Sequence, residues 1–269
     1  MTPYFSIIMV SLNANKYITP TINSILSQNF SEYEIIIKDG GSIDSTLENI
    51  PDDPRFRLIQ KQDSGIYDAM NQAIYEAKGK FLYFLNCGDE LYNKNVLSRI
   101  YEFTRELTDN KVIVYGNYVR DDLTYSIPDN ISEFYLYRTS LNHQTLFIGK
   151  ETFDEIGIYD SSLKVGADYE FECRAHFSNK IKIYHVNVII TKYLSGGYSD
   201  TDKGKQILKT DFKKVHDKYF TKATIVKYEF LQIISLKKIR RLIDSESSPF
   251  WMRRIYRGFM NIVTGKTGR

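Results

Sequence analysis

Residues 5–12 read Phe5-Ser-Ile-Ile-Met-Val-Ser-Leu12, a continuous apolar and β-branched run that decides the fold class. A run of this length without polar alternation is typical of a strand that is covered on both faces. Apolar residues then recur at helical spacing across residues 13–26, and a second short apolar run follows at residues 34–38. The alternation continues with a strand, a helix and a strand at residues 56–60, 67–78 and 81–86. This order predicts right-handed βαβ units, and therefore an α/β fold with a mostly parallel sheet and helices on both faces.

The composition is that of a globular protein. Of 269 residues, 42% are hydrophobic and 26% are charged, so the chain is long and apolar enough to bury a sizeable core. The sequence offers no secretory signal and no apolar stretch of the ~20 residues that span a bilayer. Its two cysteines, Cys87 and Cys173, lack metal-ligand spacing, so we expect a protein of the reducing cytoplasm. No cation lies beside Cys87 in the sequence to activate the thiol, which we expect to be inert.

Charge divides the chain near Asp202. Residues 1–202 carry 28 acidic and 19 basic side chains, whereas residues 203–269 carry 17 basic and 5 acidic ones. We therefore expect a main domain over residues 1–202 and a basic helical C-terminal extension over residues 203–269. A basic segment on an acidic body indicates a polyanionic partner for the extension alone.

Polar residues follow each of the four predicted strands. In open sheets of this kind, ligands bind outside the carboxyl ends of the strands, so the acidic residues Asp39, Asp63 and Asp89 are expected to converge on one edge. A lone Asp after a strand more commonly forms a turn or caps a helix, but four successive strand ends favour a binding site. The candidate residues at this edge are Ser11, Leu12, Asn13, Asp39, Asp63, Gly65, Asp68, Asn71, Asn86, Gly88 and Asp89.

In this order the motifs resemble the family 2 glycosyltransferases of the GT-A fold, which is Rossmann-like. The resemblance spans roughly residues 5 to 200 and implies transfer of a sugar from a nucleotide diphosphate donor with inversion at the anomeric carbon. It implies that the residues after the strands, from Ser11 to Gly88, bind the donor, with Asp39 at the base and the Asp63 loop in the nucleoside pocket. The stretches that carry it are Asp39-Gly-Gly-Ser-Ile-Asp-Ser-Thr46, Asp63-Ser-Gly-Ile-Tyr-Asp-Ala-Met-Asn71, Leu85-Asn-Cys-Gly-Asp89, His143-Gln144, Ala167-Asp-Tyr-Glu-Phe171 and Gly196-Gly197.

A pyrophosphate is normally bound with a divalent metal, because Mg²⁺ and Mn²⁺ prefer hard oxygen ligands. The resemblance implies Asp89 as the ligand of Mn²⁺ or Mg²⁺. The sequence departs from the family here, because Gly88 stands where a second carboxylate is expected. Modest metal affinity, or a pyrophosphate held by backbone and basic groups, are therefore alternatives. A weaker alternative is that Asp89 caps the helix expected to start near Asn93.

Inverting transfer needs a general base to take the proton of the acceptor hydroxyl. The resemblance assigns this role to Asp168, and a helix N-cap is the alternative role for the same residue. Glu170 and Glu172 follow on the same helix and are expected to be solvated.

Two further pairs complete the expected site. His143 and Gln144 open a run that reads as a strand, and the resemblance puts them on the acceptor side, although a lone His is more often structural. Gly196 and Gly197 follow the last expected strand. They either cradle the pyrophosphate through backbone N–H groups as part of a mobile lid or simply form a turn.

The extension is expected to hold two basic amphipathic helices, over residues 230–243 and 250–263. Helices of this kind suit an anionic membrane surface, where each Lys or Arg contributes about 1 kcal/mol. Packing on the domain, or on a second copy in a homodimer, is the alternative. No recognised nucleic-acid motif accompanies the charge, so nucleic acid is not expected as a partner.

The sequence therefore predicts a glycosyltransferase that is attached peripherally to the inner face of the cell membrane. Its expected substrates are a UDP-sugar and a saccharide linked to a polyprenyl pyrophosphate lipid, in the assembly of a surface polysaccharide such as an O-antigen or a capsule. A non-catalytic scaffold subunit that binds nucleotide sugars is the first alternative. A nucleotidyltransferase is less favoured, because residues 12–16 lack the glycines of its phosphate loop.

Overall fold

The computed structural model describes residues 2–234, 251, 252, 254, 255 and 258. Most of the two amphipathic helices expected over residues 230–243 and 250–263 lies outside these described residues. In the described part of the chain, every helix is too short or too polar to traverse a lipid bilayer.

One sheet organises the described residues, with strand order β3-β2-β1-β4-β8-β6-β9-β5 and with β7 paired to β6. The first four strands in this order are parallel, whereas β8 lies antiparallel between β4 and β6. The α/β prediction is confirmed. The strands are β1 (Phe5–Ser11), β2 (Tyr33–Asp39), β3 (Phe56–Gln60), β4 (Phe81–Phe84), β5 (Glu90–Leu91), β6 (Val112–Arg120), β7 (Leu123–Tyr125), β8 (Leu146–Gly149) and β9 (Lys182–Tyr193).

The register brings the ends of the strands together. Strand β1 pairs with β2 from Phe5 opposite Tyr33 to Ser11 opposite Asp39, so the loops after both strands leave the sheet at the same point. Because β4 runs parallel to β1 on its other side, the residues after β4 reach the same edge. This edge is therefore where the predicted site residues should gather.

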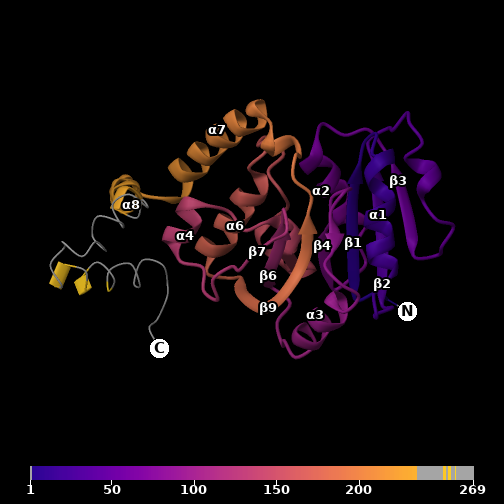
Figure 1. Cartoon of the computed structure of the whole chain (residues 1–269), viewed down its shortest axis with the longest axis horizontal. Coiled ribbons are helices and arrows are strands. Elements are labelled where there is room, and N and C mark those ends of the chain that lie inside the picture. The colour runs from indigo at the N-terminus through magenta and orange to yellow at the C-terminus, as the bar shows by residue number, and fades with distance from the viewer. Residues whose placement is uncertain (1, 235–250, 253, 256–257, 259–269) are drawn as a thin grey trace.

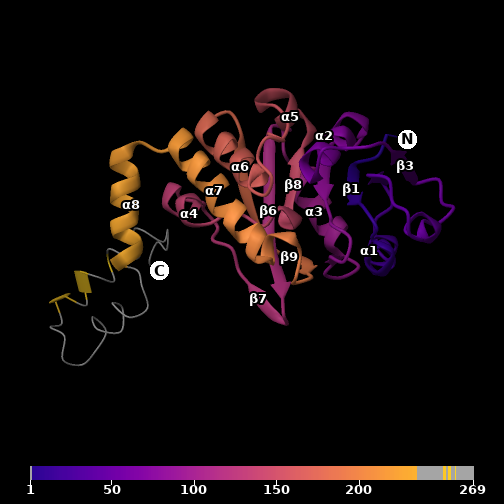
Figure 2. The same cartoon turned by 90° about the horizontal axis from the view of Figure 1, so that it is seen from above.

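Helices cover both faces of the sheet (Figures 1 and 2). Helices α1 and α3 pack on one face, against the side chains of Phe5, Ile7 and Met9. Helices α2, α4, α5 and α6 contribute to the core on the other face, which includes Ile8 and Ile36. The helices are α1 (Asn15–Leu26), η1 (Leu47–Asn49), α2 (Ile66–Glu76), α3 (Val96–Thr104), α4 (Glu133–Arg138), η2 (His143–Thr145), α5 (Lys150–Ile156), α6 (Ala167–Ser178), η3 (Tyr198–Asp200), α7 (Asp202–Tyr219) and α8 (Lys222–Ile234).

The described part of the extension packs on the domain. Helix α7 lies along α6, and its residue Val215 joins the same core as Tyr228 and Leu231 of α8. Figures 1 and 2 both show α8 at the opposite end of the molecule from the N-terminus. Residues of both α7 and α8 thus belong to the same hydrophobic core as α6.

One predicted strand begins later than expected. His143 and Gln144 lie on the single-turn helix η2, and β8 starts only at Leu146. The Asn142 side chain accepts a hydrogen bond from the backbone N–H of Gln144, at 3.2 Å, which stabilises a turn at this point. The two residues are therefore held at the end of the antiparallel strand rather than within it.

Candidate active site

A cavity of about 1170 Å³ opens at the carboxyl edge of the sheet. Ten of the predicted site residues line it, namely Leu12, Gly65, Asp68, Asn86, Asp89, His143, Gln144, Asp168, Gly196 and Gly197. Six others are not among its lining residues as the described chain forms it, namely Ser11, Asn13, Asp39, Asp63, Asn71 and Gly88. The cavity thus lies at the edge of the sheet where the strand ends predict a binding site.

Asp39 holds the loop that follows β2. Its Oδ2 accepts hydrogen bonds from Ser11 Oγ at 2.9 Å and Ser42 Oγ at 2.6 Å, and its Oδ1 accepts from the backbone N–H groups of Gly41 and Ser42 at 2.9 and 2.7 Å. Ser42 Oγ in turn accepts from the N–H of Asn13, at 2.8 Å. Burial raises the pKa of Asp39, but these hydrogen bonds outweigh it and leave the pKa below the ordinary value. The fully buried carboxylate shapes this loop, and its contact with a base stays a prediction.

Asp63 is paired with a lysine that the motifs do not point to. Lys38 Nζ lies 2.8 Å from Asp63 Oδ2, and the Lys38 side chain is completely buried. The same ammonium donates to the carbonyls of Lys61 and Asp39, at 2.6 and 3.2 Å. Lys38 therefore links the loop after β3 to the end of β2. Asp63 takes part in this link and is not among the residues that line the described cavity.

The start of α2 is organised by its own polar residues. Asp68 Oδ2 accepts from the backbone N–H and the hydroxyl of Ser64, at 2.8 and 3.0 Å, and these bonds lower the pKa of Asp68. Gly65 between them has φ +140°, a conformation that favours glycine. Asn71 exchanges two hydrogen bonds with the backbone of Tyr159, at 2.8 and 3.0 Å. Asn71 thus fastens α2 to a distant loop instead of facing the cavity.

Asp89 lies in the wall of the cavity and is 3% exposed. Its Oδ2 accepts from Gln144 Nε2 at 2.7 Å, and its Oδ1 accepts from the backbone N–H of Leu194 at 2.8 Å. Burial raises the pKa of the Asp89 carboxyl, against the lowering effect of these two hydrogen bonds. The residue does not cap the following helix, because the N-cap residue of α3 is Asn95. Asp89 therefore joins three elements at the cavity: the end of β4, the turn η2 and the segment after β9.

The glycine that breaks the family's metal motif has a structural reason. Gly88 has φ +103°, and a Cβ at this position would lie 2.8 Å from Leu194 Cδ2. A side chain here would strain the backbone, because of the positive φ, and would force the Leu194 side chain to shift. Next to it, burial raises the pKa of the Cys87 thiol to about 12, which disfavours the nucleophilic thiolate.

Asp168 and His143 form the centre of the site. His143 Nδ1 lies 3.2 Å from Asp168 Oδ2, and His143 Nε2 lies 3.0 Å from Asn86 Nδ2. Asp168 is the second residue of α6, whose N-cap is Gly166, so Asp168 is not the N-cap residue, although its Oδ1 accepts the first-turn backbone N–H of Tyr169 at 2.8 Å. Three chain segments that are distant in sequence are therefore linked, from Asn86 through His143 to the Asp168 carboxylate, in the wall of the cavity.

Tyr67 also contacts this carboxylate. Its hydroxyl lies 3.0 Å from Asp168 Oδ1 and 2.7 Å from the carbonyl oxygen of Val165. Burial, and then the charge of Asp168, raise the pKa of Tyr67 well above its ordinary value, so the phenol keeps its proton. Tyr67 is thus held as a hydrogen-bonding group between the loop before α6 and Asp168.

The expectation that Glu170 and Glu172 are solvated is wrong. Glu170 is 2% exposed and accepts from Arg174, Lys218 and Tyr219, at 2.7, 2.7 and 2.5 Å. Glu172 is 1% exposed, and its Oε2 accepts from the N–H of Leu141 at 2.8 Å. The partners of Glu170 on α7 lie almost fifty positions further along the chain, so no local pattern indicates its burial.

The segment after β9 closes one side of the cavity. Arg120 Nη2 lies 3.0 Å from Asp200 Oδ2, and Arg120 Nε donates to Ser195 Oγ at 2.9 Å. The N–H of Gly196 donates to the same Asp200 oxygen, at 2.9 Å. Gly196 has φ +94°, which favours glycine, and Gly196 and Gly197 both line the cavity, so a role of these glycines in holding a pyrophosphate stays a prediction. Residues 194–200 thus line one side of the cavity, and the Arg120–Asp200 ion pair holds this segment against the end of β6.

The residues present fit one divalent ion that arrives with a phosphate ligand. Among the described residues, no three His, Cys, Asp or Glu side chains are grouped to hold a metal. Mg²⁺ is commonly bound through one or two carboxylates, substrate phosphates and water, so Asp89 would suffice as the protein ligand. Each Asp89 oxygen accepts one hydrogen bond and keeps a further lone pair.

Several cavity residues are not indicated by the motifs. Arg120 ends β6, so the rule of strand ends would identify it if residues 112–120 were recognised as a strand. Lys164 and Lys205 also line the cavity, and neither belongs to a matched stretch. Tyr67 lies inside the Asp63–Asn71 stretch, yet nothing in the sequence shows that its hydroxyl meets Asp168.

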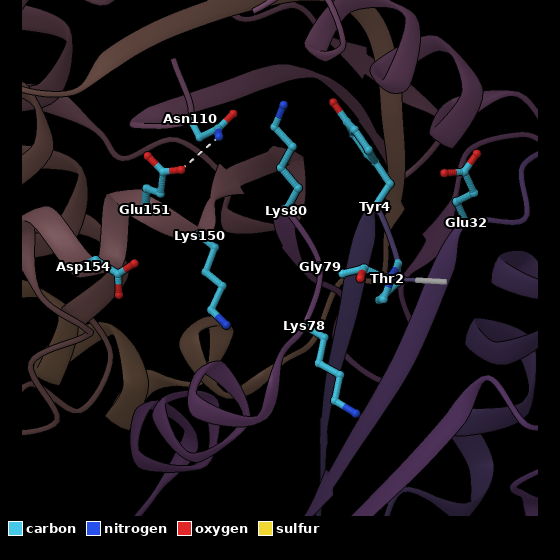
Figure 3. Close-up of a pocket in the computed structure, with 11 residues that line it drawn as sticks. Thr2, Tyr4, Glu32, Lys78, Gly79, Lys80, Asn110, Lys150, Glu151 and Asp154 are labelled. Atoms are coloured by element: carbon cyan, nitrogen blue, oxygen red, sulfur yellow. Dashed lines mark hydrogen bonds between the residues drawn. The ribbon is translucent and has the colours of Figure 1, made fainter. Parts of the chain in front are cut away.

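A second, smaller cavity of about 410 Å³ lies at the opposite edge, beside the residues that precede β1 and β4 (Figure 3). Figure 3 shows the charged side chains around it, which are Glu32, Lys78, Lys80, Lys150, Glu151 and Asp154. Lys150 Nζ donates to the carbonyl of Ala77 at 2.6 Å, and Lys80 Nζ lies 5.6 Å from the ring centroid of Tyr4. Two of the three lysines, Lys80 and Lys150, thus make contacts within the fold. The larger cavity is therefore the candidate for the active site.

Comparison with known proteins also indicates a glycosyltransferase. The sequence model of "Glycosyl transferase family 2" matches residues 6–161. A "PGL/p-HBAD biosynthesis glycosyltransferase" of Mycobacterium bovis is 31% identical over 216 residues, which cover 77% of this chain and 83% of the relative.

Solved structures share the fold. The crystal structure of S. aureus TarS 1–349 in complex with UDP-GlcNAc has a TM-score of 0.64 and 18% identity, over 96% of this chain and 80% of that chain. The same protein in complex with UDP has a TM-score of 0.60 and 19% identity, over 90% and 75%. This likeness confirms the predicted GT-A fold.

Proposed function

The chain belongs to glycosyl transferase family 2, and we propose that it transfers a sugar, with inversion, from a UDP-sugar to a lipid-linked saccharide in surface polysaccharide biosynthesis. The observation that carries the proposal is the meeting of Asp168, His143 and Tyr67 on the wall of a 1170 Å³ cavity at the carboxyl edge of the sheet. A carboxylate held in this way is suited to remove a proton from an acceptor hydroxyl.

The chain's own residues define the acid–base step. Asp168 accepts the proton of the attacking hydroxyl, while the Nδ1–H of His143 and the hydroxyl of Tyr67 hold its two oxygens in orientation. Such hydrogen bonds fix the carboxylate toward the cavity and reduce the motion needed to reach the acceptor. The attack forms the new glycosidic bond on the face opposite the leaving nucleoside diphosphate, which gives inversion.

The donor is proposed to lie against the other wall, near Leu12, Gly65 and Asp89. Asp89 is the proposed ligand of Mn²⁺ or Mg²⁺, and the ion would neutralise charge on the departing diphosphate. Arg120, Lys164 and Lys205 also line the cavity and support a share for basic groups in holding that charge. The solved structures of the same fold with UDP and UDP-GlcNAc make UDP-sugars the first donors to test.

A lipid-linked acceptor is supported by the extension. Helix α8 exposes Val226, Phe230 and Ile233, which are 66%, 60% and 55% exposed and follow one another at helical spacing. Trp251 and Ile255 are also exposed. An apolar stripe on a segment rich in Lys and Arg suits the surface of an anionic membrane, and we propose peripheral attachment there.

The test is a transfer assay with a base variant and a matched control. Donors are first chosen by thermal shift from UDP-, GDP- and dTDP-sugars, and transfer to a polyprenyl pyrophosphate saccharide is then measured with radiolabelled donor. Asp168→Asn should keep donor affinity and lose turnover by a factor on the order of 10² or more, the range of general-base removal. Asp202→Asn makes the same change in the first turn of α7, at an exposed position outside the cavity, and should leave turnover unchanged.

Three outcomes decide the matter. Near-normal turnover of Asp168→Asn would remove Asp168 from the base role. Retention of the anomeric configuration in the product would exclude the inverting mechanism. Donor binding without transfer or donor hydrolysis would favour a scaffold subunit that binds nucleotide sugars.

A further inference from the structure

Three successive backbone N–H groups converge on one carboxylate oxygen beside the active site. The N–H groups of Lys164, Val165 and Gly166 donate to Asp211 Oδ2, at 3.0, 3.1 and 3.3 Å. Asp211 belongs to α7, and it is 3% exposed. Consecutive N–H groups in a concave turn form an anion-binding nest, and here the chain fills the nest with its own side chain.

The loop that Asp211 holds leads directly to the proposed base. Gly166 is the N-cap residue of α6 and has no side chain to cap the helix, while Asp168 Oδ1 accepts the backbone N–H of Tyr169 in the first turn, at 2.8 Å. The carbonyl of Val165 accepts from the Tyr67 hydroxyl, which also contacts Asp168. A shift of this loop would therefore move both the start of α6 and the anchor of Tyr67.

The contact between α7 and the loop is close. A Cβ added to Gly166 would lie 2.9 Å from Asp211 Cβ, well inside an ordinary contact. Gly166 has φ −109°, which any residue can adopt, so the need for glycine comes from this approach and not from the backbone. The fit shows that α7 and the loop before α6 are packed as one unit.

We infer that Asp211 is a positioning residue for sugar transfer, acting on Asp168 through the loop at 164–166. The inference rests on the proposed function, because it takes Asp168 as the base. It also means that α7, within the predicted extension, serves the chemistry of the domain. Asp211 itself is not among the residues that line the described cavity.

The first experiment compares two substitutions of Asp211. In Asp211→Ala the three N–H groups lose their acceptor, and turnover should fall on the order of 10- to 100-fold, as expected for a misplaced catalytic group. The Kd for UDP should change much less than turnover does, because the Asp39 and Asp63 loops are untouched and Lys164 alone of the basic residues proposed to hold the diphosphate lies on the released loop.

Asp211→Asn keeps an amide oxygen for the three N–H groups and should retain turnover within about threefold, since a single acceptor of the same shape satisfies them. Asp217→Asn makes the same change on the exposed side of α7, where Asp217 pairs with Lys213, and serves as the control. Should Asp211→Ala fail to fold, Gly166→Ala replaces it, since the added methyl group forces the loop from α7 with the carboxylate intact. Wild-type turnover in the soluble Gly166→Ala protein would overturn the inference.

A double-mutant cycle separates this inference from the proposed function. If Asp211 acts through Asp168, then Asp211→Ala should cost little further turnover in an Asp168→Asn background. Additive losses would show that Asp211 acts elsewhere and would overturn the inference. Absence of transfer by the wild-type chain with every donor would instead contradict the proposed function, and near-normal turnover of Asp168→Asn would contradict the base assignment on which the cycle depends.

Discussion

His143 Nδ1 lies 3.2 Å from Asp168 Oδ2, and the opposite ring nitrogen lies 3.0 Å from the amide nitrogen of Asn86. With that amide donating to Nε2, the ring proton resides on Nδ1 and faces the carboxylate. The imidazole therefore serves Asp168 as a hydrogen-bond donor. This arrangement joins the end of β4, the turn η2 and the start of α6 in one line.

Replacement of His143 should affect turnover more than binding. In His143→Ala we expect turnover to fall on the order of 10- to 100-fold, because the base loses the donor that orients it. The Kd for the donor, measured by calorimetry, should stay within experimental error. His185 forms a similar pair with Asp129, at 2.7 Å and outside the cavity, so His185→Ala is the matched control. Equal effects of the two variants would contradict an orienting role for His143.

Asp89→Ala should weaken UDP binding much more in the presence of Mn²⁺ than in EDTA. The reason is that the lost carboxylate acts on the diphosphate through the ion. Asp39→Ala provides the comparison. Asp39 shapes the loop after β2, so loss of its carboxylate should weaken UDP binding equally with and without metal. Titration calorimetry with UDP under both conditions measures the difference. Equal weakening by Asp89→Ala in both conditions would show that its bonds to Gln144 and Leu194 are its whole role.

Glu172→Gln should change how stability depends on pH. Burial, and then the charge of Asp168, raise the pKa of Glu172 well above the ordinary 4.5. The folded chain thus binds a proton that the unfolded chain releases above about pH 4.5, so this residue lowers the free energy of unfolding as pH rises. The neutral variant should match the wild type below pH 4.5 and become progressively more stable above it.

Urea unfolding across this pH range measures the effect. Glu102→Gln, an exposed change on α3, should give a difference from the wild type that does not vary with pH. A Glu172→Gln difference that is equally flat would mean that Glu172 is charged in the folded protein.

Removal of residues 235–269 tests the attachment to membranes. This segment carries nine basic and two acidic side chains, and its removal leaves Tyr228 and Leu231 in the core. We expect weaker binding to anionic vesicles and lower activity on a long-chain lipid-linked acceptor, with unchanged transfer to a short soluble acceptor. Binding by the full chain should fall with salt, because exposed charges are screened within about 8 Å at physiological ionic strength. A truncated protein that binds vesicles normally but loses its fold, or splits an oligomer, would identify the segment as a packing element.

The sequence predicts those parts of the site that depend on local pattern. Apolar runs locate the strands, and the strand-end rule brings Leu12, Asn86 and Asp89 to one cavity. The pattern predicts a strand that begins at His143, but it predicts neither the true start of β8 at Leu146 nor its antiparallel place between β4 and β6, which has no local signal. His143 is consequently expected in a strand and found in a turn.

Burial of charged groups is the other part that the sequence leaves open. Glu170 is a residue type expected on the exposed side of a helix. It is buried because Lys218 and Tyr219 of α7 pack over it and donate hydrogen bonds to its carboxylate. Lys38 is buried for the same kind of reason, since Asp63 and two carbonyls surround its ammonium. Pairings between elements so distant in sequence depend on how the helices dock, which periodicity does not report.

The Asp211 contact also bears on the order in which a growing chain completes its site. The Asp39 loop has all of its partners once residues up to Ser42 are made, whereas Gly166 waits for an acceptor 45 positions later. Until α7 is synthesised and folds back, the N–H groups at 164–166 have only water to bind, and the start of α6 lacks its anchor. A ribosome-bound chain is therefore expected to form the Asp39 loop first and to order the start of α6 only after α7 has emerged.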